Sequence, residues 1–500
     1  MIVNKSLFPS AMNFRAVTNM QDRFADLQVQ LATGKKTTTL SGLGTDRSYD
    51  LTLRARLGRI DSYQKTIQTV NLRLDFYDNA MVRLDQIEAD ARTSASPGGY
   101  GADGVNLTTS PSLSEARLDE VLSLLNTQVS GRHLFGGSIT DRPPVASTSE
   151  VLDGAGGRDG FRTIMGQRKL ADAGADGLGR LGIVTAAETI TLSEDGVHPF
   201  GMKLSTLSSD SGGITLTAPT GAPASLGVEF TGPVVDGQRV TIGLTLPDGG
   251  SYSLVMSAVT GAPQTENEFS IGATDADTAT NFAAALQASL EGIGETSLAS
   301  SSVFAAADNF FNGRGETVMR VDGPPFETAT ALVAGTDVDT VFWYEGEDTS
   351  GVPRQTNSAR IDDTTSVNYG VQANEEGLVQ LVRTLAAMAA ENFPLSDNTS
   401  EGRFDYMAET QLQRLSESNN GLNGSIEVIS LELGIARATL SNVGERHNAY
   451  NNQLENLLSD IESAPIEQVA MELNAIQIRL QASYQTMTTL SELTLVNFIR

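Results

Sequence analysis

The C-terminal stretch from Ile466 to Ile499 constrains the fold of this chain most strongly. Its apolar residues recur at steps of three and four, which places them on one stripe of an α-helix. They are Ile466, Val469, Leu473, Ile476, Leu480, Tyr484, Met487 and Leu490. A narrow apolar seam on a long helix is typical of pairing with another long helix. We therefore expect this helix to pair with the other end of the chain and with further copies of it.

The N-terminal part of the chain has the same periodicity. A first helix is predicted from about Ser10 to Ala32, ended by Gly34, with a seam that includes Phe14, Val17, Phe24 and Leu27. A second pattern, from Leu57 to Ala91, predicts a helix of coiled-coil length. A Gly/Pro/Ser-rich loop over residues 94–112 then leads to a third helix that begins at Ser114.

The middle of the chain, residues 145–369, is rich in Gly, Thr, Ser and Asp and has no sustained helical period. Short alternating segments predict strands. They are Ile214–Thr217, Gly227–Phe230, Arg239–Leu246 and Tyr252–Met256. Pro247–Gly250 is a hairpin turn signal, and Asp275–Leu290 predicts one short helix. This region is therefore expected to be β-rich.

Helical periodicity returns near Ala373. A further helix is predicted to begin at Phe404 and to continue through Ile426 to Ile461, with Pro465 at the start of the last helix. The fold class is thus α+β and multi-domain, with terminal helices in a coiled coil or bundle and a β-rich insertion. The expected parts are a core helix (1–45), two bundle segments (46–144 and 370–463), a variable surface region of one or two small domains (145–369) and a C-terminal core helix (464–500).

Composition excludes several classes of function. The net charge of −27 disfavours nucleic-acid binding, which needs a concentrated basic face. The absence of cysteine excludes disulfides, thiolate metal sites and cysteine nucleophiles, and it suits a protein that works outside the cell. No apolar run is long enough to span a membrane, so no membrane insertion is expected. The start of the chain does not resemble a cleaved secretory signal, so export would use another route.

Isolated motifs that could indicate chemistry have simpler interpretations. Gly177–Gly182 matches G-x-G-x-x-G, but an Ala/Asp/Gly-rich segment precedes it, so a flexible loop is expected instead of a dinucleotide site. The three histidines, His133, His198 and His447, lie far apart in sequence and outside any ligand or triad spacing. His133 is expected to be a packed or partly exposed aromatic.

Paired carboxylates are interpreted in the same way. Asp362–Asp363 and Glu375–Glu376 are expected to be solvated acidic surface. Asp275 and Asp277 lack the other ligands of a calcium loop and are expected to cap a helix. Trp343 is expected in the core of a β domain. We therefore expect no enzymatic activity, no catalytic residue, no cofactor and no metal site.

Several segments together resemble the bacterial flagellin family. They are Leu31-Ala-Thr-Gly-Lys-Lys36, Gly131-Arg-His-Leu-Phe-Gly-Gly137, Tyr369-Gly-Val-Gln-Ala-Asn-Glu375, Leu480-Gln-Ala-Ser-Tyr484 and the ending from Leu490 to Phe498. The resemblance covers about residues 1–145 and 370–500. It is greatest to the hook-associated proteins of the hook–filament junction, mainly because of the segment 131–137. Residues 44–48, Gly-Thr-Asp-Arg-Ser, depart from the family pattern.

The resemblance implies a structural subunit of the flagellum that joins hook to filament. Its implied partners are copies of itself, a neighbouring hook-associated protein, flagellin and an export chaperone, and its implied location is outside the cell after type III export. The residues expected to pack between subunits are Phe14, Val17, Phe24, Leu27, Leu473, Ile476, Leu480, Met487 and Leu490. Two alternatives stay open: the flagellin of the filament itself, and an extracellular adhesin or enzyme on a helical stalk.

Overall fold

The computed structural model describes residues 8–94, 96–312, 316–348 and 351–498, which divide into two compact units. Unit 1 comprises Met1–Thr69, Arg360–Ser366 and Thr439–Arg500, and unit 2 comprises Val70–Ala359 and Val367–Ala438. Two helices, α2 (Arg47–Ser94) and α10 (Ile426–Glu462), contribute to both units. The chain is mixed in class, with long helices toward both ends and sheets in the middle, as predicted.

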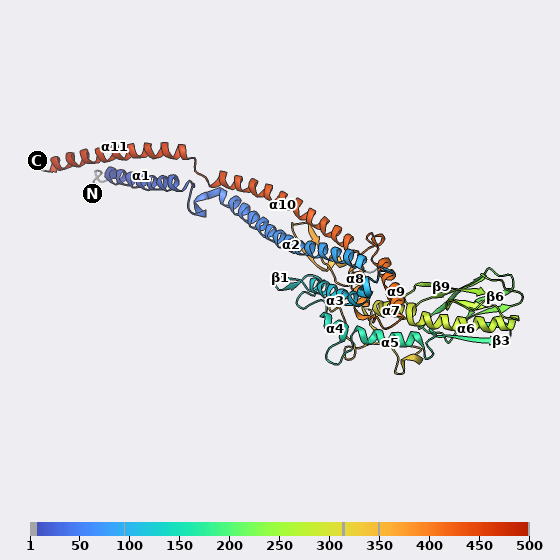
Figure 1. The fold of residues 1–500 in the computed structure, drawn as a ribbon. Coiled ribbons are helices and arrows are strands. Elements are labelled where there is room, and N and C mark those ends of the chain that lie inside the picture. The colour runs from blue at the N-terminus through green and yellow to red at the C-terminus, as the bar shows by residue number, and fades with distance from the viewer. Residues whose placement is uncertain (1–7, 95, 313–315, 349–350, 499–500) are drawn as a thin grey trace. The chain divides into compact units, whose positions relative to one another are not determined.

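The first and last helices pair within unit 1. These are α1 (Phe8–Thr33) and α11 (Ile466–Phe498), and Figure 1 shows them side by side. The side chain of Gln21 donates to Tyr484, whereas near the other end of α1 the N–H of Ala464 donates to the carbonyl of Gly34 at 2.9 Å. Since residue numbers rise along one helix and fall along the other, the pair is antiparallel. The predicted pairing of the chain ends is confirmed.

The end of α1 is explained by one backbone position. Gly34 has φ +69°, a left-handed conformation that glycine accepts without a Cβ clash. A 3₁₀ helix, Leu40–Asp46, then leads into α2. In unit 1 the seam between α2 and α10 is apolar, and its buried members are Leu53, Ile60 and Leu454.

Unit 2 contains a helical part. Its helices are α3 (Val105–Leu125), α4 (Thr148–Asp153), α5 (Phe161–Ala173), α7 (Ala299–Phe310), α8 (Glu376–Ala390) and α9 (Ser400–Arg414). α8 packs against both α3 and α7, and α7 packs against α5 and α9. Three two-stranded sheets lie in segments that connect the helices. They are β1 (Gln128–Val129) with β2 (Arg132–His133), β11 (Met319–Val321) with β12 (Leu332–Ala334), and β13 (Ser358–Arg360) with β14 (Ser366–Asn368).

Two predicted helix boundaries are wrong. The third helix begins at Val105 and contains Pro111, because burial of residues such as Leu107 and Ser114 outweighs the hydrogen bond that proline cannot make. The helix predicted from Phe404 to Ile461 is two helices, α9 and α10. The Asn/Gly-rich run between them turns the chain at Gly424, which has φ +85°.

The sheets of unit 2 form its second part. One has the order β3-β4-β7-β6 and the other β10-β9-β8-β5, antiparallel throughout except for the parallel pair β10-β9. Their bounds are β3 Leu181–Ala186, β4 Thr189–Glu194, β5 Lys203–Ser209, β6 Ile214–Gly221, β7 Ala224–Phe230, β8 Arg239–Thr245, β9 Ser251–Val259 and β10 Glu268–Ser270. The four predicted strands and the β8–β9 hairpin are confirmed.

Helix α6 (Asp275–Ile293) completes the core of these sheets, and Figure 1 shows it running along them. Phe282 of α6 packs edge-to-face on Phe230 and Phe269, at centroid distances of 5.6 and 5.1 Å. The predicted helix is therefore confirmed, and so is the capping role of Asp277, which forms a capping box with Thr274.

The middle region is less uniformly β than expected, because α4, α5 and α7 also lie in it. Trp343 is buried, as predicted, but it packs edge-to-face on Phe311 at the end of α7. Its core is therefore helical, and the expectation of a β core for Trp343 is wrong. Among the described helices, none is both long and apolar enough to span a bilayer.

Candidate interaction surface

The paired helices α1 and α11 bury a short apolar seam. Leu27, Ala464 and Val469 form its buried centre, and Leu473 and Ile476 pack against them. The structure thus brings together three of the residues predicted to pack between subunits, Leu27, Leu473 and Ile476. In this chain they pack within the antiparallel pair, so part of the predicted stripe is already covered.

The other predicted residues have different environments. Val17 and Leu480 are buried at 8% exposure each, whereas Phe24 and Met487 are partly buried. Phe14 is 67% exposed. The side chain of Leu490 lies outside the described residues.

A second set of apolar side chains on the same two helices faces solvent. Their exposed fractions run from 41% to 71%, and they are Met12, Phe14, Val29, Leu31, Ile466, Met471, Ile478 and Tyr484. Phe14, Leu31, Ile466 and Tyr484 belong to the predicted stripes, whereas Met12, Val29, Met471 and Ile478 lie off them and are not indicated by the periodicity. Large apolar side chains exposed in this number on one pair of helices are candidates for contact with a partner.

Polar contacts fix the register of the pair. Arg23 bridges Glu472 at 3.0 Å, but both side chains are about half exposed, so the pair contributes little stability. Glu462 is a stronger anchor because Lys35 and Arg54 both bridge it and its side chain is mostly buried. Hydrogen bonds from Lys35 are the largest influence that lowers the pKa of Glu462, against the opposing effect of burial. This cluster holds the end of α10 against Lys35, which follows α1, and Arg54 of α2.

Two segments singled out in the sequence, 131–137 and 369–375, meet each other in unit 2. Gly136 and Gln372 form an antiparallel bridge, and the N–H of Ala373 donates to the carbonyl of Phe135 at 2.8 Å. Tyr77 of α2 lies against Phe135 edge-to-face at 5.4 Å. Two segments separated by more than two hundred residues therefore form one structural element, which we call the motif junction (131–137 and 369–375).

Arg354 fastens the second segment of the motif junction to α10. Its guanidinium bonds the carbonyl of Gly370 and the carboxylate of Glu375, and it reaches Glu432 at 2.9 Å. Burial raises the pKa of Glu375, and the charge of Arg354 offsets part of that effect. The expectation that Glu375 belongs to solvated acidic surface is wrong, because Glu375 is only 4% exposed while Glu376 faces solvent.

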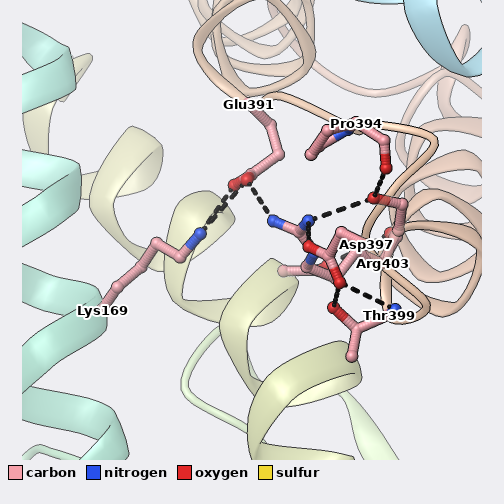
Figure 2. A network of polar contacts seen from close by, with 8 residues as sticks. Lys169, Glu391, Pro394, Asp397, Thr399 and Arg403 are labelled. Atoms are coloured by element: carbon pink, nitrogen blue, oxygen red, sulfur yellow. Dashed lines mark hydrogen bonds and ion pairs between the residues drawn. The ribbon is translucent and has the colours of Figure 1, made fainter.

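A second buried network joins α5 to the segment between α8 and α9 (Figure 2). The carboxylate of Glu391 forms ion pairs with Lys169 and with Arg403, each at 2.9 Å. Arg403 also bridges Asp397, whose pKa is lowered chiefly by hydrogen bonds from the backbone and side chain of Thr399. Both cations and both carboxylates have partners inside the network, so its role is to fasten helices together.

The remaining sequence candidates have structural roles. Gly177–Gly182 lies between a helix, α5, and a strand, β3, the reverse of the strand–loop–helix order of a dinucleotide site. Gly177 and Gly179 have positive φ, and Gly179 lies close against Met202. The segment is a packed turn, so the expectation of a flexible loop is not supported there.

Each histidine is held by neighbours in its own region. His133 is partly exposed, as expected, and its Nδ1 lies 2.9 Å from the carbonyl of Asn126. His198 lies between Asp195 and Arg180, and His447 Nε2 lies 2.8 Å from the carbonyl of Ile361. Across the described residues, no three His, Asp or Glu side chains are grouped so as to hold a metal ion.

Comparison with known proteins adds no identification. No protein-family profile matches the sequence, and no curated protein matches it significantly. The function must therefore be argued from the residues and from the interaction surface described above.

Proposed function

We propose that this protein is a structural subunit of the bacterial flagellum that joins hook to filament and assembles through its terminal helices. The observation that carries the proposal is the α1–α11 pair, which buries one seam and leaves further large apolar side chains of the same helices in solvent. Covering a large apolar side chain contributes roughly 1.5–3 kcal/mol. A neighbouring subunit that covers several of them supplies a substantial driving force for assembly.

The exposed apolar side chains lie on two antiparallel helices of one chain. We propose that neighbouring copies cover them in a head-to-tail contact, which produces a helical filament when it does not close a ring. The proposed partners are copies of the same chain, a hook-associated neighbour, flagellin and an export chaperone, in an extracellular location. Segment 131–137 favours the junction role over filament flagellin, because its sequence resembles junction proteins more than filament flagellin.

Two substitutions test the assembly face. Leu480→Asp places a charge at a buried position of the α1–α11 contact and should abolish assembly by separating the two helices. Ile478→Asp changes a side chain that is 66% exposed, so it should abolish assembly while α1 and α11 stay paired. Val338→Asp, at an 82% exposed position in unit 2, is the matched control and should assemble normally. Sedimentation velocity measures all three, and normal polymers from Ile478→Asp would refute the assigned face.

The junction role has its own test. Electron microscopy of cells that lack this protein should show hooks without filaments. If the protein were the filament flagellin instead, its loss would leave the junction in place. Copy number per flagellum also separates the junction role from the filament role, because a junction ring holds few copies and a filament holds thousands. Complete filaments in the deletion strain would exclude both flagellar roles.

A further inference from the structure

Unit 1 contains a polar cleft that the assembly face does not include. Its volume is about 530 Å³. α2 contributes one wall, α10 another, and the segment 360–366 supplies two acidic residues. The lining residues are Arg56, Arg59, Ile60, Tyr63, Asp362, Asp363, Arg446, His447 and Tyr450. With three arginines against two aspartates, the lining is positive in a chain whose net charge is −27.

The two aspartates of the cleft are already paired. Asp363 accepts a hydrogen bond from the hydroxyl of Tyr63 at 2.9 Å and bridges Arg59 at 3.3 Å. The hydrogen bond from Tyr63 is the main cause that lowers the pKa of Asp363. Asp362 pairs with Arg446. The acidic residues of the cleft thus neutralise two of its three arginines and leave the third.

The remaining arginine is Arg56. Its guanidinium donates to the hydroxyl oxygen of Tyr450 at 3.1 Å, and no Asp or Glu of the described chain pairs with it. Because Tyr450 accepts that bond, its own hydroxyl hydrogen is available to donate, and no acceptor for it lies in the described residues. Two adjacent donors therefore face the cleft, and Tyr450 is 38% exposed. A forked guanidinium beside a hydroxyl suits the two oxygens of a carboxylate.

The far wall of the cleft is rigid. Tyr63 stacks on His447 with ring centroids 5.7 Å apart, and His447 is fixed by its contact with the carbonyl of Ile361, which is fully buried. Arg56, Arg59 and Tyr63 recur on one face of α2, as Arg446 and Tyr450 do on α10. The donors are thereby presented by helices and not by loops, which favours specific binding.

We propose that this cleft binds the carboxylate of an exposed Asp or Glu from a second copy of the chain, with Arg56 and Tyr450 as the two donors. The proposal rests on the self-assembly proposed above. Charge complementarity favours a second copy as the partner. The chain carries 61 acidic residues against 34 basic ones, so each copy has a net charge of −27. Contacts of this type set the register and partner choice of an interface more than its total affinity.

The test compares self-association of the full chain by sedimentation velocity at low salt. Arg56→Gln should weaken association about tenfold and Tyr450→Phe about threefold. Arg47→Gln is the matched control because Arg47 is an exposed arginine of the same unit and helix, outside the cleft, and it should associate like the wild type. Free glutarate should compete with wild-type association and have no effect on Arg56→Gln. Circular dichroism confirms that each variant is folded.

Each outcome is decisive. Equal association of wild type and Arg56→Gln overturns the cleft proposal and leaves the assembly proposal intact. Binding of glutarate at Arg56 without any effect on association overturns the second copy as the source of the carboxylate. A wild-type chain that does not associate under any condition overturns both proposals.

Discussion

Arg354 shows how one side chain can hold distant segments of this chain together. It is 9% exposed and contacts the carbonyl of Gly370 and the carboxylates of Glu375 and Glu432, so three parts of unit 2 converge on one guanidinium. A buried ion pair is not in itself a large source of stability, because desolvation costs much of what the attraction contributes. Removal of one partner is costly, since the other charge is then buried alone.

We predict that Arg354→Met lowers the free energy of unfolding of unit 2 by about 3–5 kcal/mol. The double variant Arg354→Met/Glu375→Gln should recover part of this loss, because no unpaired charge then stays buried at position 375. Arg437→Met is the control: its bridge to Asp75 is exposed on both sides, and its loss should cost less than about 1 kcal/mol. Urea denaturation measures all three. A double variant no more stable than the single one would contradict this account.

Glu88 is a partly buried carboxylate whose ionisation opposes the fold. Burial is the main cause that raises its pKa to about 7, and the neighbouring carboxylates of Glu427 and Asp85 raise it further against the effect of Arg92. The folded chain therefore prefers the protonated form of this side chain. Its contribution to stability is greatest below the unfolded pKa of about 4.3 and is lost as pH rises through 7.

Glu88→Gln should consequently stabilise unit 2 at pH 8 by on the order of 1 kcal/mol, after allowance for the part of the side chain that water screens. The gain should shrink at pH 5.5, where the wild-type side chain is mostly protonated. Urea unfolding at the two pH values measures the difference. A gain of the same size at both would show that ionisation of Glu88 is not its cause.

At the scale of helices and strands, two glycines of unit 1 have different roles. Gly34 has φ +69° and ends α1, whereas Gly58 lies inside α2 without a positive φ. A Cβ at either position would meet no atom within 4 Å, so steric overlap does not distinguish them. The same substitution therefore isolates the effect of backbone conformation.

We predict opposite signs for the two changes. Gly34→Ala should destabilise unit 1 by about 1 kcal/mol, because alanine resists the left-handed conformation. Gly58→Ala should stabilise it by about 0.5–1 kcal/mol, because it lowers the conformational entropy of the unfolded chain and raises helix propensity. Thermal unfolding followed by circular dichroism compares them. Destabilisation by both would mean that Gly58 has a packing role that its open surroundings do not show.

Helices with a repeating stripe of large apolar residues could be predicted from sequence, and a short helix of small residues could not. α1, α2, α8 and α11 show such a stripe. α7 consists largely of Ser and Ala between residues 299 and 307, so its sequence carries no such stripe although most of these residues are buried. The β8–β9 hairpin was predictable because its turn signal is local.

The interaction surface was predictable only in part, for a related reason. Periodicity identified the seam at Leu27 and Leu473 and predicted the pairing of the two helices, but it could not show which seam residues the pair would bury and which it would leave exposed. Nor could it reveal Ile478, which lies off the stripe. The burial of Glu375 depends on Arg354, 21 residues away, and sequence pattern carries no information on that contact.

At the scale of the whole molecule, the α1–α11 pair and the two large sheets differ greatly in the number of apolar side chains that they bury. Among the described residues, the α1–α11 contact buries five apolar side chains, Val17, Leu27, Ala464, Val469 and Leu480, whereas the core of the two sheets and α6 buries more than twenty. Local stability follows the density of buried contacts, so a segment with few of them opens at a small cost in free energy. The surface proposed for assembly thus lies on the part of the chain that should open most readily.

Hydrogen exchange on the full chain can test this difference directly. In the dilute monomer, amides of α1 and α11 should exchange orders of magnitude faster than those of β8 and β9. On assembly, protection should rise in α1 and α11, because neighbouring subunits cover their apolar face, while protection in the sheets stays unchanged. A monomer in which both terminal helices are already as protected as the sheets would show that they need no partner. The assembly proposal would then lose its physical basis, because the exposed face of Ile478 and Met471 would contribute nothing that a neighbour could improve.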